Sequence, residues 1–155
     1  PQLSFSVSTS TIALGNLPPT TVIDAPQTID ITMSTNASSG GDVYINGQNG
    51  GLYSASTSST IISATGDLSS LGNGFGAQVT SVSQSSGGPF SKVNPYDGTS
   101  STVGITNNTI RKIISSSYPI GGGAGSILLK AKASSTDVVA NDYQDVITIL
   151  ASASF

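Results

Sequence analysis

The sequence contains no cysteine, histidine, tryptophan or glutamate, and these absences exclude several kinds of chemistry. Without imidazole or thiolate, the usual zinc and copper sites, a cysteine nucleophile and a Ser-His-Asp triad cannot form. Charged residues make up 8% of the 155 residues, against about 25% in an average soluble protein. Five cations and a net charge of −3 are too few to neutralise a nucleic-acid backbone. No apolar run approaches the about 20 residues of a membrane span.

Small hydroxyl side chains are what the sequence has in abundance, because 29 serines and 17 threonines occupy 46 of the 155 positions. A surface rich in hydroxyls and poor in charge is typical of secreted or surface-exposed prokaryotic proteins. The first residue, Pro1, suits a mature form after removal of a signal peptide, although a truncated chain would look the same. We therefore expect an extracellular or cell-surface location. Asn36 and Asn107 begin N-glycosylation sequons, which also arise by chance in a chain of this composition.

Apolar and hydroxyl side chains alternate with a period of two in short segments, which predicts half-buried strands. The clearest segments are residues 3–8, 29–34, 43–45 and 147–153. Further candidate strands are residues 11–14, 60–64, 76–82, 102–106 and 126–133. Turn signals separate them every 8–15 residues. This spacing predicts one all-β domain over residues 1–155, a jelly-roll or immunoglobulin-like sandwich of roughly nine or ten strands with little helix.

A few segments leave local structure open. Asp67–Gly72 predicts a single capped turn. Asn108–Ser115 fits a short helix or a strand, and its β-branched residues favour the strand. Loops are expected at residues 47–51, 85–95 and 119–125. In the last of these, Gly121–Gly125 is expected to be too flexible for a strand.

Catalytic and metal sites find little support in the sequence. All eight carboxylates are aspartates, and the closest grouping is Asp137, Asp142 and Asp145. These three are weak candidates for calcium ligands, but their spacing matches no calcium loop and turn chemistry explains Asp137 and Asp142. Gly72–Gly76 lacks the Lys-Ser/Thr pair of a phosphate-binding loop. We expect no enzyme activity, no catalytic residues, no metal site and no cofactor.

Two other kinds of surface chemistry remain as alternatives. Aromatic rings can stack on sugars, and the candidates are Tyr44, Tyr53, Tyr96, Tyr118 and Tyr143. Lys130 and Lys132 could form an isopeptide bond to an asparagine, as in some bacterial surface proteins. Both lysines alternate with alanines and are expected to point outward, which disfavours that bond.

Several stretches together resemble a known group of proteins. They are residues 3–8, Leu14–Pro18, Ile29–Gly40, Gly74–Gly76 and Ala140–Ile149. The last is similar to a closing strand written Ala-Gly-x-Tyr-x-Asp-x-hydrophobic-Thr, with Asn141 in place of the glycine. The chain thus resembles secreted prokaryotic β-sandwich surface proteins, including camelysin-type fibre proteins of biofilm matrices and strand-exchanging pilins. The resemblance implies an extracellular structural role, without identifying a ligand.

The first eight residues suggest how such a role would be performed. Leu3, Phe5 and Val7 lie on one side of an alternating segment that no turn precedes. Such a segment forms the ordinary first strand of a monomer or adds as a strand to another copy. Repeated head-to-tail, the second arrangement gives a homopolymer. We therefore expect a subunit of a pilus, matrix fibre or cell-surface layer that assembles by donor-strand exchange. The alternative is a monomeric surface adhesin or carbohydrate-binding module that binds surface glycans.

Overall fold

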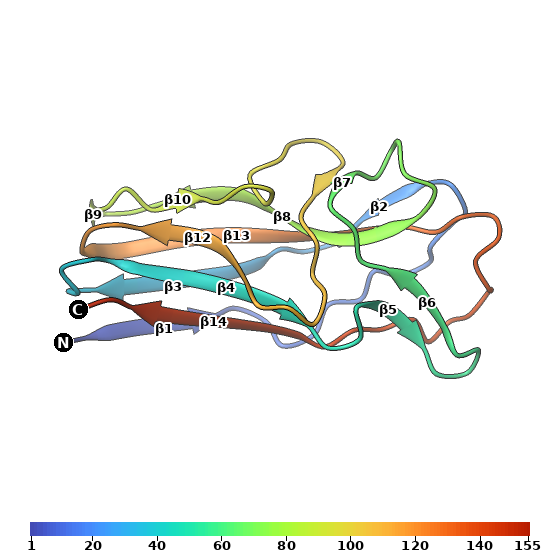
Figure 1. Cartoon of the computed structure of the whole chain (residues 1–155), viewed down its shortest axis with the longest axis horizontal. Coiled ribbons are helices and arrows are strands. Elements are labelled where there is room, and N and C mark those ends of the chain that lie inside the picture. Colours follow the sequence, from blue (N-terminus) through green and yellow to red (C-terminus); the bar gives the residue numbers. More distant parts are fainter.

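The computed structural model describes all 155 residues and consists of strands joined by turns and bends, with no helix (Figure 1). The fourteen strands are β1 (Leu3–Val7), β2 (Val22–Asp24), β3 (Ile29–Thr35), β4 (Gly41–Gly47), β5 (Gly51–Ser54), β6 (Ser59–Ile62), β7 (Gly66–Asp67), β8 (Gly74–Ser83), β9 (Ser86–Gly87), β10 (Ser91–Lys92), β11 (Thr102–Val103), β12 (Arg111–Ser116), β13 (Ile120–Lys132) and β14 (Ile147–Ala153). The all-β prediction is confirmed. The expected nine or ten strands are too few, because five strands span only two or three residues and leave no alternation to detect. The structure has no helix long and apolar enough to cross a membrane.

The larger sheet has six strands arranged around β13. One edge of β13 pairs with β3 and, further along, with β2. Its other edge pairs with β8 and with the short β9. β1 pairs with β3 in an unbroken antiparallel register, with Leu3 opposite Thr35 and Val7 opposite Ile31. β1 is therefore the outermost strand on one side of this sheet.

The smaller sheet has four antiparallel strands in the order β10-β12-β4-β14. Asn108–Ser115 is extended along most of its length and supplies β12, so the preference for strand over helix in this segment is confirmed. β14 is the last strand on the side of this sheet opposite β10. Two further pairs, β5 with β6 and β7 with β11, form separate two-stranded sheets.

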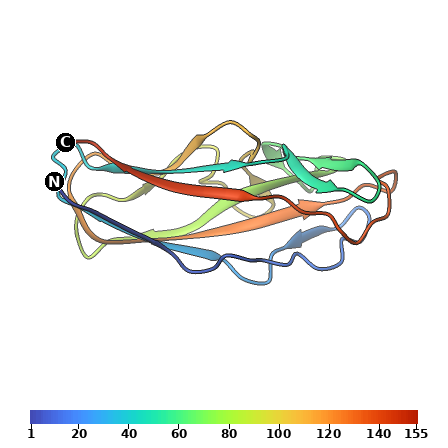
Figure 2. The same ribbon diagram turned by 90° about the horizontal axis from the view of Figure 1, so that it is seen from below.

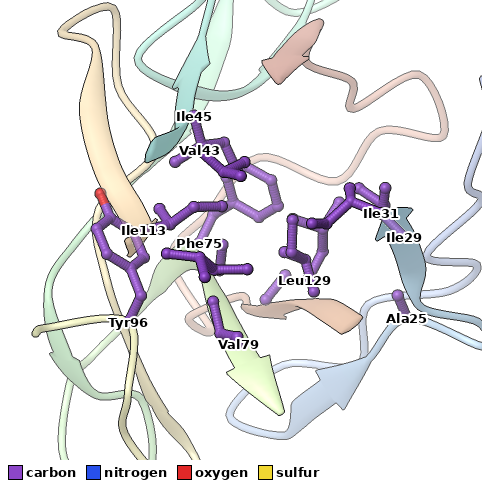
Figure 3. Close-up of a cluster of buried hydrophobic side chains, with 14 of the residues drawn as sticks. Ala25, Ile29, Ile31, Val43, Ile45, Phe75, Val79, Tyr96, Ile113 and Leu129 are labelled. Carbon is purple, nitrogen blue, oxygen red and sulfur yellow. The ribbon is translucent and has the colours of Figure 1, made fainter. Parts of the chain in front are cut away.

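The core lies between the two larger sheets, which form separate layers when viewed edge-on (Figure 2). Ile31 of β3 faces this core from the larger sheet, while Val43 and Ile45 of β4 face it from the smaller one (Figure 3). All three side chains are at most 1% exposed, and each such burial stabilises by about 1.5–3 kcal/mol. Buried and accessible residues alternate along β3 and β4, which confirms the inner faces predicted from the sequence.

The glycine-rich stretch Gly121–Gly125 was expected to be a flexible connector, and this expectation is wrong. It forms the first half of β13. A Cβ on Gly123 would lie 2.8 Å from the Met33 carbonyl oxygen, and one on Gly125 would lie 2.7 Å from the Ile114 side chain. These glycines let neighbouring chains approach closely. Gly122, with φ of +60°, lies at the interruption of the β13–β3 register.

Lys130 and Lys132 alternate with core alanines and point to the outer face of the larger sheet, as predicted, but this face is covered there. They are only 5% and 7% exposed, because Lys132 donates to the carbonyls of Ser69 and Leu71. Lys130 pairs with Asp24 at 2.6 Å. The predicted capped turn after Asp67 exists, and it covers this outer face of the larger sheet.

Candidate functional site

The two strands that end the larger and smaller sheets on the same side, β1 and β14, leave a long edge of the molecule uncovered. Each pairs on one side only, β1 with β3 and β14 with β4. The two strands lie together at the end that carries both chain termini and diverge toward the other end (Figures 1 and 2). We call the side formed by β1, β14 and their extensions the open edge. Unpaired strand edges of this kind are templates for pairing with another chain.

The predicted assembly residues Leu3, Phe5 and Val7 all lie in β1, and their side chains face the core side of the sheet. They are incompletely buried there, with Leu3 38% and Val7 40% exposed. Phe5 is half-buried against the core. No residue of β1 is charged and none is proline, so the strand lacks the usual protection of an exposed edge.

The chain beyond β1, residues 12–17, pairs with no other segment, and Gly15 within it has a φ of +74°. Ile12, Leu14 and Leu17 turn toward the core, while Ala13 and Gly15 are exposed. No backbone N–H or C=O of residues 12–17 has a hydrogen-bond partner in the protein. The candidate strand at residues 11–14 therefore has the predicted alternation but no neighbouring strand, which is why it is not counted among the fourteen.

A second unpaired segment precedes β14. The backbone groups of residues 139–141 have no hydrogen-bond partner within the protein. Two apolar side chains are exposed here, with Val138 49% and Val139 94% accessible. The two adjacent valines form a small exposed apolar patch beside this segment.

Between these two segments lies a hollow of about 770 Å³. Residues 12–17 and 138–141 form its two lips, and its floor is made of core residues that include Leu52, Phe75 and Leu129. We call this feature the edge hollow. It combines an apolar floor with two lips whose backbone donors and acceptors are free, which is the requirement for receiving an extended chain.

Asp142 fixes the lip that leads into β14. Its Oδ2 accepts a hydrogen bond from the Ser56 N–H at 2.8 Å, and its Oδ1 accepts from the hydroxyls of Ser54 and Ser56 at 2.5 and 2.9 Å. These donors, first of all the Ser54 hydroxyl, lower the pKa of Asp142 to about 2. The carboxylate therefore clamps this lip to β5 and the turn that follows it.

Asp145 lies three residues further along, and its pKa is shifted in the opposite direction. Its Oδ1 accepts from the N–H groups of Asn49 and Val146 at 2.9 and 2.8 Å, whereas its buried Oδ2 has no partner. Burial raises the pKa of Asp145 despite these hydrogen bonds. Reciprocal backbone hydrogen bonds between Tyr53 and Gln144 complete the attachment of this lip.

Asp137, the third weak calcium candidate, accepts from the Asn73 amide and from the Ser134 N–H. Asp137, Asp142 and Asp145 thus serve three different turns. No group of three or more potential metal-ligating side chains of the His, Cys, Asp and Glu types is brought together in the structure. Their visible role is to fix the loops around the edge hollow.

The two sequon asparagines lie outside the strands. Asn36 is exposed beside the N-terminus, and its Oδ1 accepts from the Gln2 N–H at 2.8 Å. Asn107 is half-buried, and its Oδ1 accepts from the Thr109 N–H. Asn36 therefore helps to hold the beginning of β1 in its own molecule.

The five tyrosines considered for sugar stacking lie in different surroundings. Tyr96 is 1% exposed and donates to the Ile105 carbonyl, and burial raises its pKa to about 12. Tyr44 lies on the outer face of β4 and donates to Asp42. Tyr118 is exposed in the turn before β13. Tyr53 and Tyr143 are half-buried, and Tyr143 borders the edge hollow. These placements give no shared aromatic platform.

Sequence reasoning identified β1 but missed the edge hollow. The sequence signals for the edge hollow are the alternation of Ile12 and Leu14 and the adjacent Val138 and Val139. In comparisons with known proteins, no family model, curated protein or solved structure matches this chain.

Proposed function

We propose that the chain is a β-sandwich of the jelly-roll or immunoglobulin-like kind, and that it serves as a structural, non-enzymatic subunit of an extracellular filament or cell-surface layer. Copies join by β-strand addition, with β1 as the exchanged strand. The observation that carries this proposal is the uncharged, half-exposed edge strand β1 on an otherwise uncovered edge.

The energetics of β1 favour exchange over permanent attachment. Its five residues pair with β3, but its inner side chains keep a large part of their surface in water. Full burial of Leu3, Phe5 and Val7 against another copy would add about 0.025 kcal/mol for each Å² of apolar surface removed from water. Because the same strand can leave one copy and join another, repeated exchange produces an open-ended polymer.

The surface composition suits dense packing of copies. With 8% charged residues and a net charge of −3, repulsion between neighbouring copies is small. Hydroxyl groups supply the polar surface instead. On the outer face of the larger sheet, for example, Ser6 and Thr32 hydrogen-bond across strands at 2.7 Å. This composition supports the structural role and an extracellular location.

The test is polymer formation by purified protein, followed by electron microscopy and light scattering. We expect ordered filaments from the unmodified chain, and their loss in the double variant Phe5→Ser, Val7→Ser. The matched control is Ile62→Ser, Ile110→Ser, because these side chains are 66% and 55% exposed and lie outside the open edge. Circular dichroism verifies that both variants fold. A chain that stays monomeric under all conditions and binds a glycan array would instead be an adhesin.

A further inference from the structure

The acceptor for an exchanged strand can be identified from unused hydrogen-bonding groups. Residues 12–17 and 139–141 lie on opposite lips of the edge hollow, and their backbone groups have no partner in the protein. A small apolar ligand would leave those groups unused, whereas a β-strand between the lips can pair with both.

We propose that the edge hollow is the acceptor for β1 of the next copy, an inference that rests on the proposed function. Leu3, Phe5 and Val7 of the incoming strand would point to the floor formed by core residues such as Leu52 and Leu129. Ser4 and Ser6 would point to solvent. The occupant carries no charged side chain, so its insertion buries none.

The positions of β1 and the edge hollow determine the form of the assembly. β1 lies toward the end of the molecule that carries the termini, and the lips of the hollow lie toward the other end of the same open edge (Figures 1 and 2). Contact between two different surfaces of neighbouring copies does not close on itself unless the rotation between copies closes a ring. The expected product is therefore a head-to-tail filament that extends roughly along the long axis of the molecule.

The hinge for this movement is the segment between β1 and the lip formed by residues 12–17. Few bonds hold it to the rest of the molecule. The Ser8 N–H donates to the Asp30 carbonyl at 2.9 Å, the Asp30 N–H donates to the Ser8 hydroxyl at 2.9 Å, and the Gln27 amide donates to the Thr11 carbonyl at 3.3 Å. Residues 9 and 10 have no backbone bond to another segment. β1 can therefore move out as a unit once its own hydrogen bonds to β3 break.

A competing acceptor is the edge of β3 that β1 vacates. There Ser4 of another copy would lie opposite Ser34, as it does within one molecule. The two acceptors place Ser4 in different surroundings, opposite Ser34 in a simple swap and between the lips of the edge hollow, one of which contains Val139, in the proposed arrangement. Because the chain contains no cysteine, single cysteines can report which arrangement forms.

The experiment mixes pairs of single-cysteine variants under assembly conditions and adds a short bifunctional thiol crosslinker. One mixture contains Ser4→Cys with Val139→Cys, and the other contains Ser4→Cys with Ser34→Cys. Because each chain has a single thiol, we expect crosslinked dimers of the two variants from the first mixture. Filaments that crosslink only in the second mixture would overturn the acceptor while leaving the proposed function intact. Absence of filaments from all of these chains and from the unmodified protein would overturn both.

A blocking variant gives an independent readout. Val139→Lys adds a charge to a lip of the hollow, at a side chain that is 94% exposed and so contributes little to folding. We expect at least a tenfold rise in the protein concentration needed for filaments, with an unchanged unfolding transition. Ile62→Lys, another change of an exposed apolar residue, should leave that concentration within about twofold. Equal effects of the two variants would exclude the hollow as the acceptor.

Discussion

The two long edges of the stacked sheets differ in how their outer strands are covered. On the side of β8 and β10, other segments use the free edge of β8: Ala77 and Gly104 exchange two backbone hydrogen bonds, and the Val79 N–H donates to the Tyr96 carbonyl. Lys92 of β10 donates to the Thr80 carbonyl and thereby ties the two sheets together. On the open edge, no segment of residues 1–155 pairs with the outer side of β1 or β14.

The difference shows that edge protection here comes from chain connections more than from charge. The residues between β8 and β12 cross from the larger sheet to the smaller one, and they supply the backbone partners of β8 as well as the buried ring of Tyr96. The open edge has neither such a crossing segment nor a charged side chain in β1. One edge is therefore covered within the molecule, and the other keeps unpaired backbone groups.

The largest expected effect is on amide hydrogen exchange. The N–H groups of Ala77 and Val79 are bonded within a buried strand and should exchange only through global unfolding. Those of Ala13 and Leu14 have no partner and should exchange almost as fast as in an unfolded peptide. Exchange of the monomer measured by NMR should separate the two groups by several orders of magnitude. Strong protection of residues 12–17 in the monomer would show that this edge is already covered.

A matched pair of aromatic truncations should differ by several kcal/mol. Tyr96→Ala removes a side chain that is 1% exposed and is expected to cost about 3–5 kcal/mol, in the range for large-to-small changes in a core. Phe5→Ala removes a half-buried ring from β1 and should cost the monomer about 1 kcal/mol or less. Urea unfolding monitored by circular dichroism measures both. Similar losses at the two positions would contradict the contrast between the edges.

The strands around which the two edges are built could largely be predicted from alternation. Residues 3–8, 29–34 and 147–153 gave the location and inner face of β1, β3 and β14, because one buried face imposes a period of two. The glycines of residues 121–125 were wrongly predicted to form a flexible loop, because the contacts that require glycine there come from other segments. They lie against Met33 and Ile114, and no local pattern reveals those neighbours.

The candidate site shows the same limit more strongly. β1 was identified from its own residues, but the edge hollow depends on segments more than 100 residues apart. Turn chemistry was expected to explain Asp142, but its donors Ser54 and Ser56 are 88 and 86 residues away. Lys132 is on the outer face of the sheet, as predicted, but it is buried by the turn after Asp67. Covering layers and unpaired backbone are properties of the tertiary structure, so a single sequence does not show them.

Asp142→Asn tests whether the lip of the open edge is held by its carboxylate. The folded-state pKa of about 2 is below the usual 3.8, so the ionised side chain stabilises the fold above about pH 4, and this contribution is lost as pH falls through 2. The unmodified chain should therefore be more stable than the variant at neutral pH, and the difference should shrink in acid. Urea midpoints measured from pH 6 to pH 2 follow it. A difference that does not vary with pH would exclude the charged clamp.

The smallest effect on stability is expected at Asp145, where the dependence on pH has the opposite sign to that at Asp142. Its pKa is raised by burial, so in the window between the usual value and the raised one the folded chain binds more protons than the unfolded chain. Stability therefore falls as pH rises through that window, and the ionised carboxylate is a cost at neutral pH. Asp145→Asn keeps an oxygen for the Asn49 and Val146 N–H groups and replaces the unpartnered Oδ2 by an amide. The variant should equal or exceed the stability of the unmodified chain at pH 7, measured by urea unfolding beside Asp142→Asn. A loss as large as that of Asp142→Asn would mean that both carboxylates anchor this lip through their charge.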